Sequence, residues 1–167
     1  MKTIVVGLGN PILGDDGVGW KVAQEVERLL ASSGASLGTD VAVDYSALGG
    51  LSLMESLTGY EDAILVDALA LDQPPGTVLT FPLEELPNQS AGHTTSAHDT
   101  SLQDALKMGS TMGVELPGRI MVVGIAARRL YDFSESLSPE VAESVPIAAQ
   151  RVLDLLTERE YSTKVIL

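Results

Sequence analysis

Residues 7–19, with the sequence GLGNPILGDDGVG, constrain the fold of this chain more than any other stretch. The apolar run 4–6 leads into them, and an amphipathic helical pattern follows them. Glycine allows backbone conformations that other residues avoid, and Pro11 fixes its own. We therefore expect a strand that turns sharply into a helix and presents Asp15 and Asp16 at the rim. In an open α/β sheet, ligands bind in the crevice beyond the carboxyl ends of the strands.

Uninterrupted apolar runs recur along the chain and are typical of buried parallel strands. They occupy residues 3–7, 41–43, 63–66 and 120–125. A weaker run at 76–81 is expected at a sheet edge, in antiparallel orientation. Helical patterns separate the runs and begin near residues 17, 51, 100 and 138. This alternation predicts a three-layer α/β/α sandwich, in which a mostly parallel, twisted sheet of about five strands carries helices on both faces. Residues 1–167 are expected to form one domain.

The helix ends carry their own signals. Asp16 is predicted to be the N-cap of the first helix, and Ser138 that of the last, since both residue types cap well. Thr100 and Gln103 have the spacing of a capping box. Pro146 lies inside the last helical pattern, where we expect it to kink the helix or split it in two.

The charge balance excludes some partners. The chain has 10 Lys and Arg against 23 Asp and Glu, a formal net charge of −13, which opposes binding to nucleic acid. It has no cysteine, so disulfides and thiolate metal sites are excluded. The N-terminus does not resemble a secretory signal, and no apolar run has the length of a membrane span. We predict a cytoplasmic monomer that binds neither nucleic acid nor membrane.

The glycine-rich turn does not match a nucleotide-binding loop. A dinucleotide fingerprint requires glycine where this chain has Ile12. A phosphate-binding loop requires lysine and Ser or Thr after its last glycine, whereas Asp15 and Asp16 follow Gly14. Two carboxylates would repel the phosphates of either ligand. The turn therefore favours a cation over a nucleotide.

Two further residues are candidates for a cation site with Asp16. Asp67 follows the central apolar run, where it is either a turn aspartate or a ligand that converges with Asp16 on one crevice. His98 precedes a helical pattern, and the positive end of a helix keeps imidazole neutral and able to bind a metal. Two carboxylates and one imidazole suit Zn, Ni or Fe with open coordination positions. His93 is expected to be an ordinary surface histidine.

These residues lie within motifs that resemble the hydrogenase maturation endopeptidases, and the motifs follow one another over nearly the whole chain. They are Leu8-Gly9-Asn10-x-x-x-x-Asp15-Asp16-Gly17-x-Gly19, Val66-Asp67-Ala68, Ser96-Ala97-His98, VVGI at 122–125 and Ser138-Pro139-Glu140-Val141. One departure lies after the second strand, in a loop tied to substrate recognition. Members usually have Gly-Thr there, and this chain has Ser46-Ala47.

The resemblance implies an endopeptidase that removes the C-terminal extension of a nickel-loaded [NiFe] hydrogenase large-subunit precursor. It implies that Asp16, Asp67 and His98 are both the catalytic and the metal-binding residues. Nickel is then supplied by the substrate, and the enzyme alone holds it weakly or carries an adventitious divalent metal. Two alternatives stay open. The first is a peptidyl-tRNA hydrolase, because GLGNP also begins those enzymes, although they continue with a His-Asn pair and are typically basic. The second is a non-catalytic metal- or protein-binding module.

Overall fold

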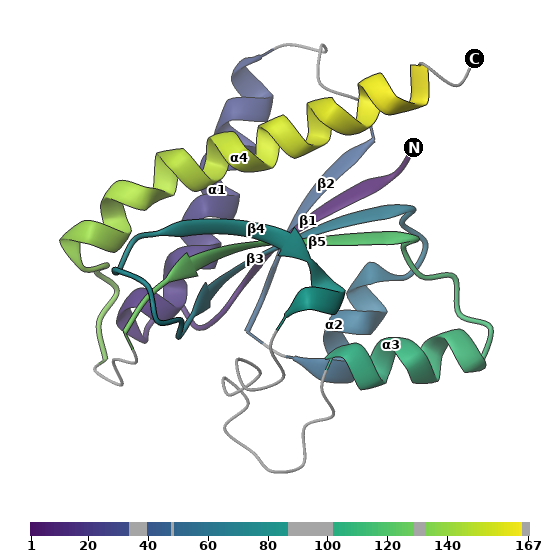
Figure 1. Ribbon diagram of the computed structural model, residues 1–167, viewed down its shortest axis with the longest axis horizontal. Coiled ribbons are helices and arrows are strands. Elements are labelled where there is room, and N and C mark those ends of the chain that lie inside the picture. Colours follow the sequence, from purple (N-terminus) through teal and green to yellow (C-terminus); the bar gives the residue numbers. More distant parts are fainter. Residues whose placement is uncertain (34–39, 48, 87–101, 129–132, 165–167) are drawn as a thin grey trace.

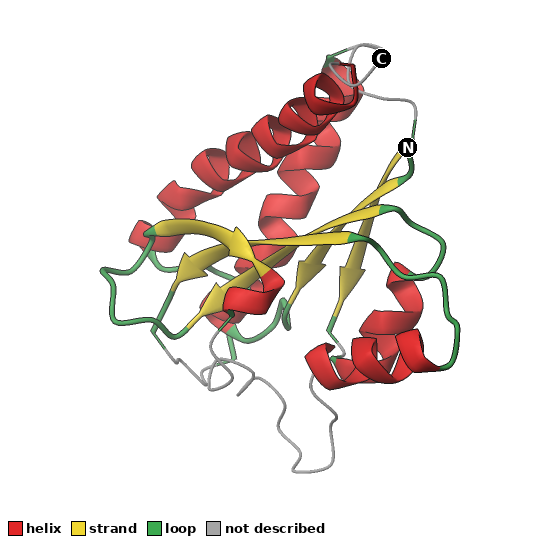
Figure 2. Ribbon diagram, turned by 45° about the vertical axis from the view of Figure 1, so that its right-hand side comes forward, coloured by secondary structure: helices red, strands yellow, loops and turns green. Residues whose placement is uncertain are grey.

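The computed structural model describes residues 1–33, 40–47, 49–86, 102–128 and 133–164, with the side chains of 159–164 excepted. Its centre is a five-stranded sheet in the order β2-β1-β3-β5-β4. The strands are β1 (Thr3–Leu8), β2 (Val41–Ser46), β3 (Asp62–Leu69), β4 (Val78–Pro82) and β5 (Arg119–Ala126). The first four in that order are parallel, and β4 pairs antiparallel with β5 at the edge, so its arrow opposes the others in Figure 2. The predicted antiparallel edge strand is thus confirmed.

Helices cover both faces of the sheet (Figure 1). The elements are the short 3-10 helices η1 (Gly14–Gly17) and η3 (Leu83–Glu85), and α1 (Val18–Ser32), α2 (Gly50–Leu57), α3 (Leu102–Thr111) and α4 (Pro139–Lys164). The helices α1 and α4 pack together on one face, and α2 and α3 on the other. The predicted three-layer arrangement is confirmed. None of the described helices is long and apolar enough to cross a membrane.

Alternation along each central strand divides the apolar side chains between two cores. Val5 and Ile64 face α1 and α4, whereas Val6 and Leu65 face α2 and η3. Successive side chains of a strand point to opposite faces, so a strand covered on both faces must be apolar at every position. This requirement explains why the central strands have uninterrupted apolar runs.

Of the two effects expected of Pro146, a kink or a split, the split does not occur, because α4 is one continuous helix. The residues after Pro146 anchor α4, since Ala148, Ala149 and Val152 are fully buried. Pro146 has no N–H for the carbonyl of Ala142, but Ala142 is exposed, where solvent can replace that bond. Burial of the helix face therefore outweighs the cost of the proline.

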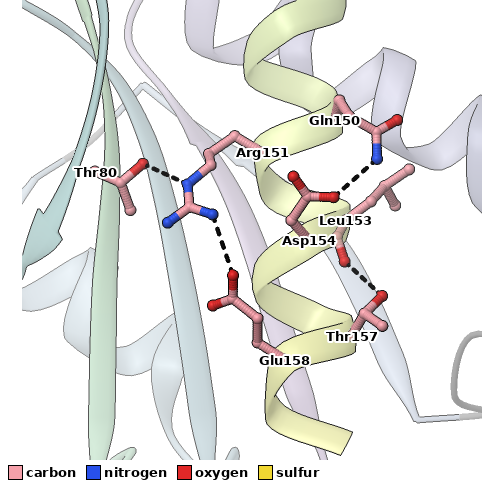
Figure 3. Close-up of polar contacts among 7 residues, drawn as sticks. All are labelled: Thr80, Gln150, Arg151, Leu153, Asp154, Thr157 and Glu158. Atoms are coloured by element: carbon pink, nitrogen blue, oxygen red, sulfur yellow. Dashed lines mark hydrogen bonds and ion pairs between the residues drawn. The ribbon is translucent and has the colours of Figure 1, made fainter. Parts of the chain in front are cut away.

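A polar contact also joins α4 to the edge strand (Figure 3). The Nε of Arg151 donates to Thr80 Oγ1 on β4 at 3.1 Å, and its Nη1 lies 3.3 Å from Glu158 Oε1. Further along the same helix, Gln150 donates to Asp154 at 3.0 Å. The Arg151 side chain thus spans from the helix layer to β4, the outermost strand of the sheet.

Tyr45 near the end of β2 packs against α1. Its ring lies 5.3 Å from that of Trp20, centroid to centroid, and its hydroxyl donates to Glu27 Oε2 at 2.7 Å. Burial, the hydrogen bond to Glu27 and the charges of Glu27 and Asp44 raise the pKa of Tyr45 to about 12.

This raised pKa makes stability depend on pH in the alkaline range. The fold favours the neutral phenol, whose pKa in the unfolded chain is about 10. The stabilisation is complete below about pH 10 and is lost as the pH rises towards 12. We expect a phenolate absorbance step near pH 12 that is missing in Tyr45→Phe. A difference titration between the two proteins with a midpoint near 10 would contradict this assignment.

Candidate functional site

The turn between β1 and α1 is built around Gly9. This residue has φ of +113°, and a Cβ there would collide with the carbonyl oxygen of Asp16. The loop therefore folds back on itself, and the Asn10 N–H donates to Asp16 Oδ2 at 2.7 Å. Asn10 Oδ1 in turn accepts from the Ile12 N–H at 3.2 Å. The first hydrogen bond orients the Asp16 carboxylate, and the second holds the Asn10 side chain against the loop.

A second glycine places the following helix over the sheet. A Cβ on Gly19 would collide with the carbonyl oxygens of Leu8 and Val66, the first at the end of β1 and the second in β3. The first turn of α1 therefore lies directly over the carboxyl ends of two neighbouring strands. Asp16, three residues before Gly19, lies at the same edge.

The adjacent aspartates Asp15 and Asp16 have different roles. Asp15 is only 3% exposed, so the expectation that both lie at the rim was wrong for this residue. Its Oδ1 accepts from the Ser138 N–H at 2.7 Å, and its Oδ2 accepts from the Ser138 hydroxyl at 2.8 Å. A carboxylate at the start of α4 is also favoured by the helix dipole. Asp15 is therefore a structural residue that joins η1 to the last helix.

Asp16 is partly exposed and does not cap α1 as predicted. Gly17 occupies the N-cap position, and no side chain accepts a hydrogen bond there. The reason is that Asp16 belongs to η1, and its carboxylate turns back towards Asn10. Its carboxylate is therefore held at the sheet edge by the Asn10 N–H.

Asp67 lies inside β3, which continues to Leu69. The end of the apolar run at Val66 had indicated that the strand ends before Asp67. Its partner on β5 is Gly124, while the pairing of β3 with β1 stops at Val66. Asp67 is thus the first residue of β3 after the part that pairs with β1. It is half-buried, and η1 packs against β3. Asp16 and Asp67 accordingly come from touching elements at one sheet edge.

The third predicted ligand, His98, lies outside the described residues, as do His93 and the proposed cap Thr100. Within the described ranges no three His, Cys, Asp or Glu side chains are grouped as a metal site would require. Gln103, the other half of the predicted capping box, donates through Nε2 to the carbonyl of Leu83 at 3.1 Å. The structure thus brings two of the three candidate ligands to one edge.

The sequence of this chain matches the family profile of the hydrogenase maturation proteases over residues 43–155. A putative hydrogenase maturation protease of Methanocaldococcus jannaschii is 30% identical over 90% of this chain and 93% of its own length. The chain belongs to the hydrogenase maturation protease family. As a member of this family it is a peptidase, which is a hydrolase, and the peptidyl-tRNA hydrolase alternative is set aside.

Solved structures support the fold of this maturation protease. The hydrogenase maturating endopeptidase HybD of Escherichia coli has a TM-score of 0.71 at 23% identity, with 95% of this chain and 94% of that one covered. A hydrogenase 2 maturation peptidase from a Thaumarchaeota archaeon has a TM-score of 0.62 at 29% identity, with 93% and 98% covered. Both superpose over nearly the whole length of the maturation protease.

The maturation protease has an open cleft of about 590 Å³ at the same sheet edge as the two aspartates. It is lined by residues 70–75, which follow β3, and by Ala127 and Arg128, which follow β5. The strand that carries Asp67 therefore leads directly into the cleft. Sequence patterns did not predict it, because both walls are loops whose approach depends on the register of β3 and β5.

Proposed function

We propose that this chain removes the C-terminal extension of a nickel-loaded [NiFe] hydrogenase large-subunit precursor. Membership of the family supports proteolysis of a hydrogenase precursor. The observation that carries the choice of site is that η1, which carries Asp16, packs against β3, which carries Asp67 and leads into an open cleft. We assign this reaction to a monomer in the cytoplasm.

In this proposal Asp16, Asp67 and His98 bind the nickel that the precursor already carries. Carboxylate oxygen and imidazole nitrogen are suitable ligands for nickel, and three protein ligands leave coordination positions for those of the substrate. A bound divalent metal polarises a carbonyl and acidifies water. Asp16 is held by the Asn10 N–H, so its orientation is fixed before the substrate arrives. The carboxylate that the nickel engages less fully accepts the proton of the attacking water, as a general base of the aspartyl type.

The nickel dependence is tested with protein that has been stripped of metal by a chelator. The large-subunit precursor of the same organism is prepared with and without nickel, and cleavage is followed by intact mass. We expect cleavage of the nickel-loaded precursor alone, because the site is complete only when the substrate supplies the metal. Equal cleavage of both precursors would contradict the nickel dependence, and cleavage of neither would contradict the proposed function as a whole.

A further inference from the structure

Two exposed apolar side chains, Ile12 and Phe133, are neighbours at the edge that carries Asp16, and we call them the rim pair. Leu13 and Ser134 form a parallel β-bridge between the loops that carry them. The Ser134 N–H donates to the Ile12 carbonyl at 2.9 Å, and the Gly14 N–H donates to the Ser134 carbonyl at 2.7 Å. In parallel pairing, the backbones of the residues that precede the bridged ones lie next to each other. The bridge therefore fixes Ile12 beside Phe133.

The exposure of the rim pair is high. Phe133 is 84% exposed and Ile12 is 46% exposed. Scattered exposed apolar residues are common, but adjacent ones on a rigid support mark interaction sites. Phe133 is also one of only two phenylalanines in the chain, and the other, Phe81, packs against the core. The fold thus leaves its other phenylalanine in solvent.

Hydrogen bonds hold the described backbone on both sides of the bridge that carries the rim pair. Besides the two bonds of the bridge, the buried Asp15 carboxylate accepts two hydrogen bonds from Ser138. We call these four bonds the brace. Side chains on such a support lose little conformational entropy on binding, which favours their use as contacts.

We propose that the rim pair docks apolar side chains of the hydrogenase precursor beside the segment that is cleaved. This inference rests on the proposed function and names the surface that recognises the substrate protein. The Asp16 N–H donates to the carbonyl of Leu13, the residue after Ile12, at 3.2 Å, so a precursor that reaches Asp16 comes close to the rim pair. An exposed aromatic ring and its aliphatic neighbour suit an apolar patch of a protein, where aromatic anchors supply much of the affinity.

The test compares two double variants. Ile12→Ser/Phe133→Ser removes the rim pair, and Met112→Ser/Ile147→Ser is the matched control. Met112, directly after α3, is 74% exposed, and Ile147, on α4, is 61% exposed. Steady-state processing of nickel-loaded precursor is measured for both. We expect the KM of the rim variant to rise about tenfold or more, with kcat unchanged, and both constants of the control to stay as in the wild type.

Binding is measured separately, so that failure of this inference differs from failure of the proposed function. The Kd of the precursor is compared with and without the rim substitutions by calorimetry in an Asp16→Asn background, where we expect cleavage to be slower by roughly two orders of magnitude or more. We expect the rim substitutions to weaken binding about tenfold. An unchanged Kd would overturn the docking proposal even if the wild type processes the precursor. The docking proposal would also be overturned if the rim variant lost kcat at unchanged KM. It would be overturned too if the wild type were a dimer and the rim substitutions made it a monomer.

Discussion

Asp16→Asn is expected to abolish precursor processing while the protein stays folded. The substitution removes one anionic ligand of the proposed nickel site and keeps the size of the side chain. The amide oxygen of Asn can still accept the hydrogen bond from the Asn10 N–H, which spans 2.7 Å to Asp16 in the wild type. We expect processing to fall by roughly two orders of magnitude or more, since even groups behind metal ligands contribute about 10- to 100-fold.

The matched control is Asp154→Asn on the exposed face of α4. Asp154 accepts a hydrogen bond from Gln150, which Asn can also accept, so the control loses the same charge with the same geometry. Processing is followed by intact mass and folding by thermal denaturation. Normal processing by Asp16→Asn, or an equal loss in Asp154→Asn, would remove Asp16 from the site.

Asp15→Ala is expected to cause a large loss of stability, whereas Asp16→Asn is expected to stay folded. It removes both acceptors of the Ser138 donors and leaves a polar group of the α4 terminus without its partner. Each part-buried donor left unsatisfied costs about 1–3 kcal/mol, so we expect the two donors together to cost about 2–6 kcal/mol. For a chain of this size, about 2–4 °C per kcal/mol predicts a Tm lower by roughly 4–24 °C.

Ser138→Ala separates the two bonds of Asp15. It removes only the hydroxyl donor and keeps the backbone N–H, so we expect a loss of about 1 kcal/mol. Both variants are compared with the wild type by denaturant unfolding. If Asp15→Ala lost no more stability than Ser138→Ala, the bond from the backbone N–H would contribute nothing, and the structural role of Asp15 would have to be revised.

Most of the sheet could be predicted because its signal is local. Strands covered by helices on both faces must be apolar at every position, and the runs at Ile4–Val6 and Ala63–Val66 meet this requirement. The common edge of Asp16 and Asp67 followed from the same argument, since parallel strands end on one side. The length of β3 could not be predicted in this way. A polar residue at the end of an apolar run does not show whether pairing with the next strand continues.

The roles of neighbouring residues were harder to predict. Asp15 and Asp16 are chemically identical, and only the arrival of Ser138, 123 residues later in the chain, makes one of them structural. The pairing of Ile12 with Phe133 has no sequence signal for the same reason. Whether His98 completes the site stays a prediction, since it lies outside the described residues.

The brace also has a consequence for the order of folding and synthesis. Its bonds between Asp15 and Ser138 close a loop of 123 residues, so contacts near the N-terminus wait for a segment made late. Closing such a loop costs entropy that local helices and hairpins do not pay, and contacts of this kind slow folding. A nascent chain that has not yet released residue 138 from the ribosome cannot fix its first turn through Ser138. The brace therefore makes the turn that carries Asp16 one of the last parts of the fold to reach its final form.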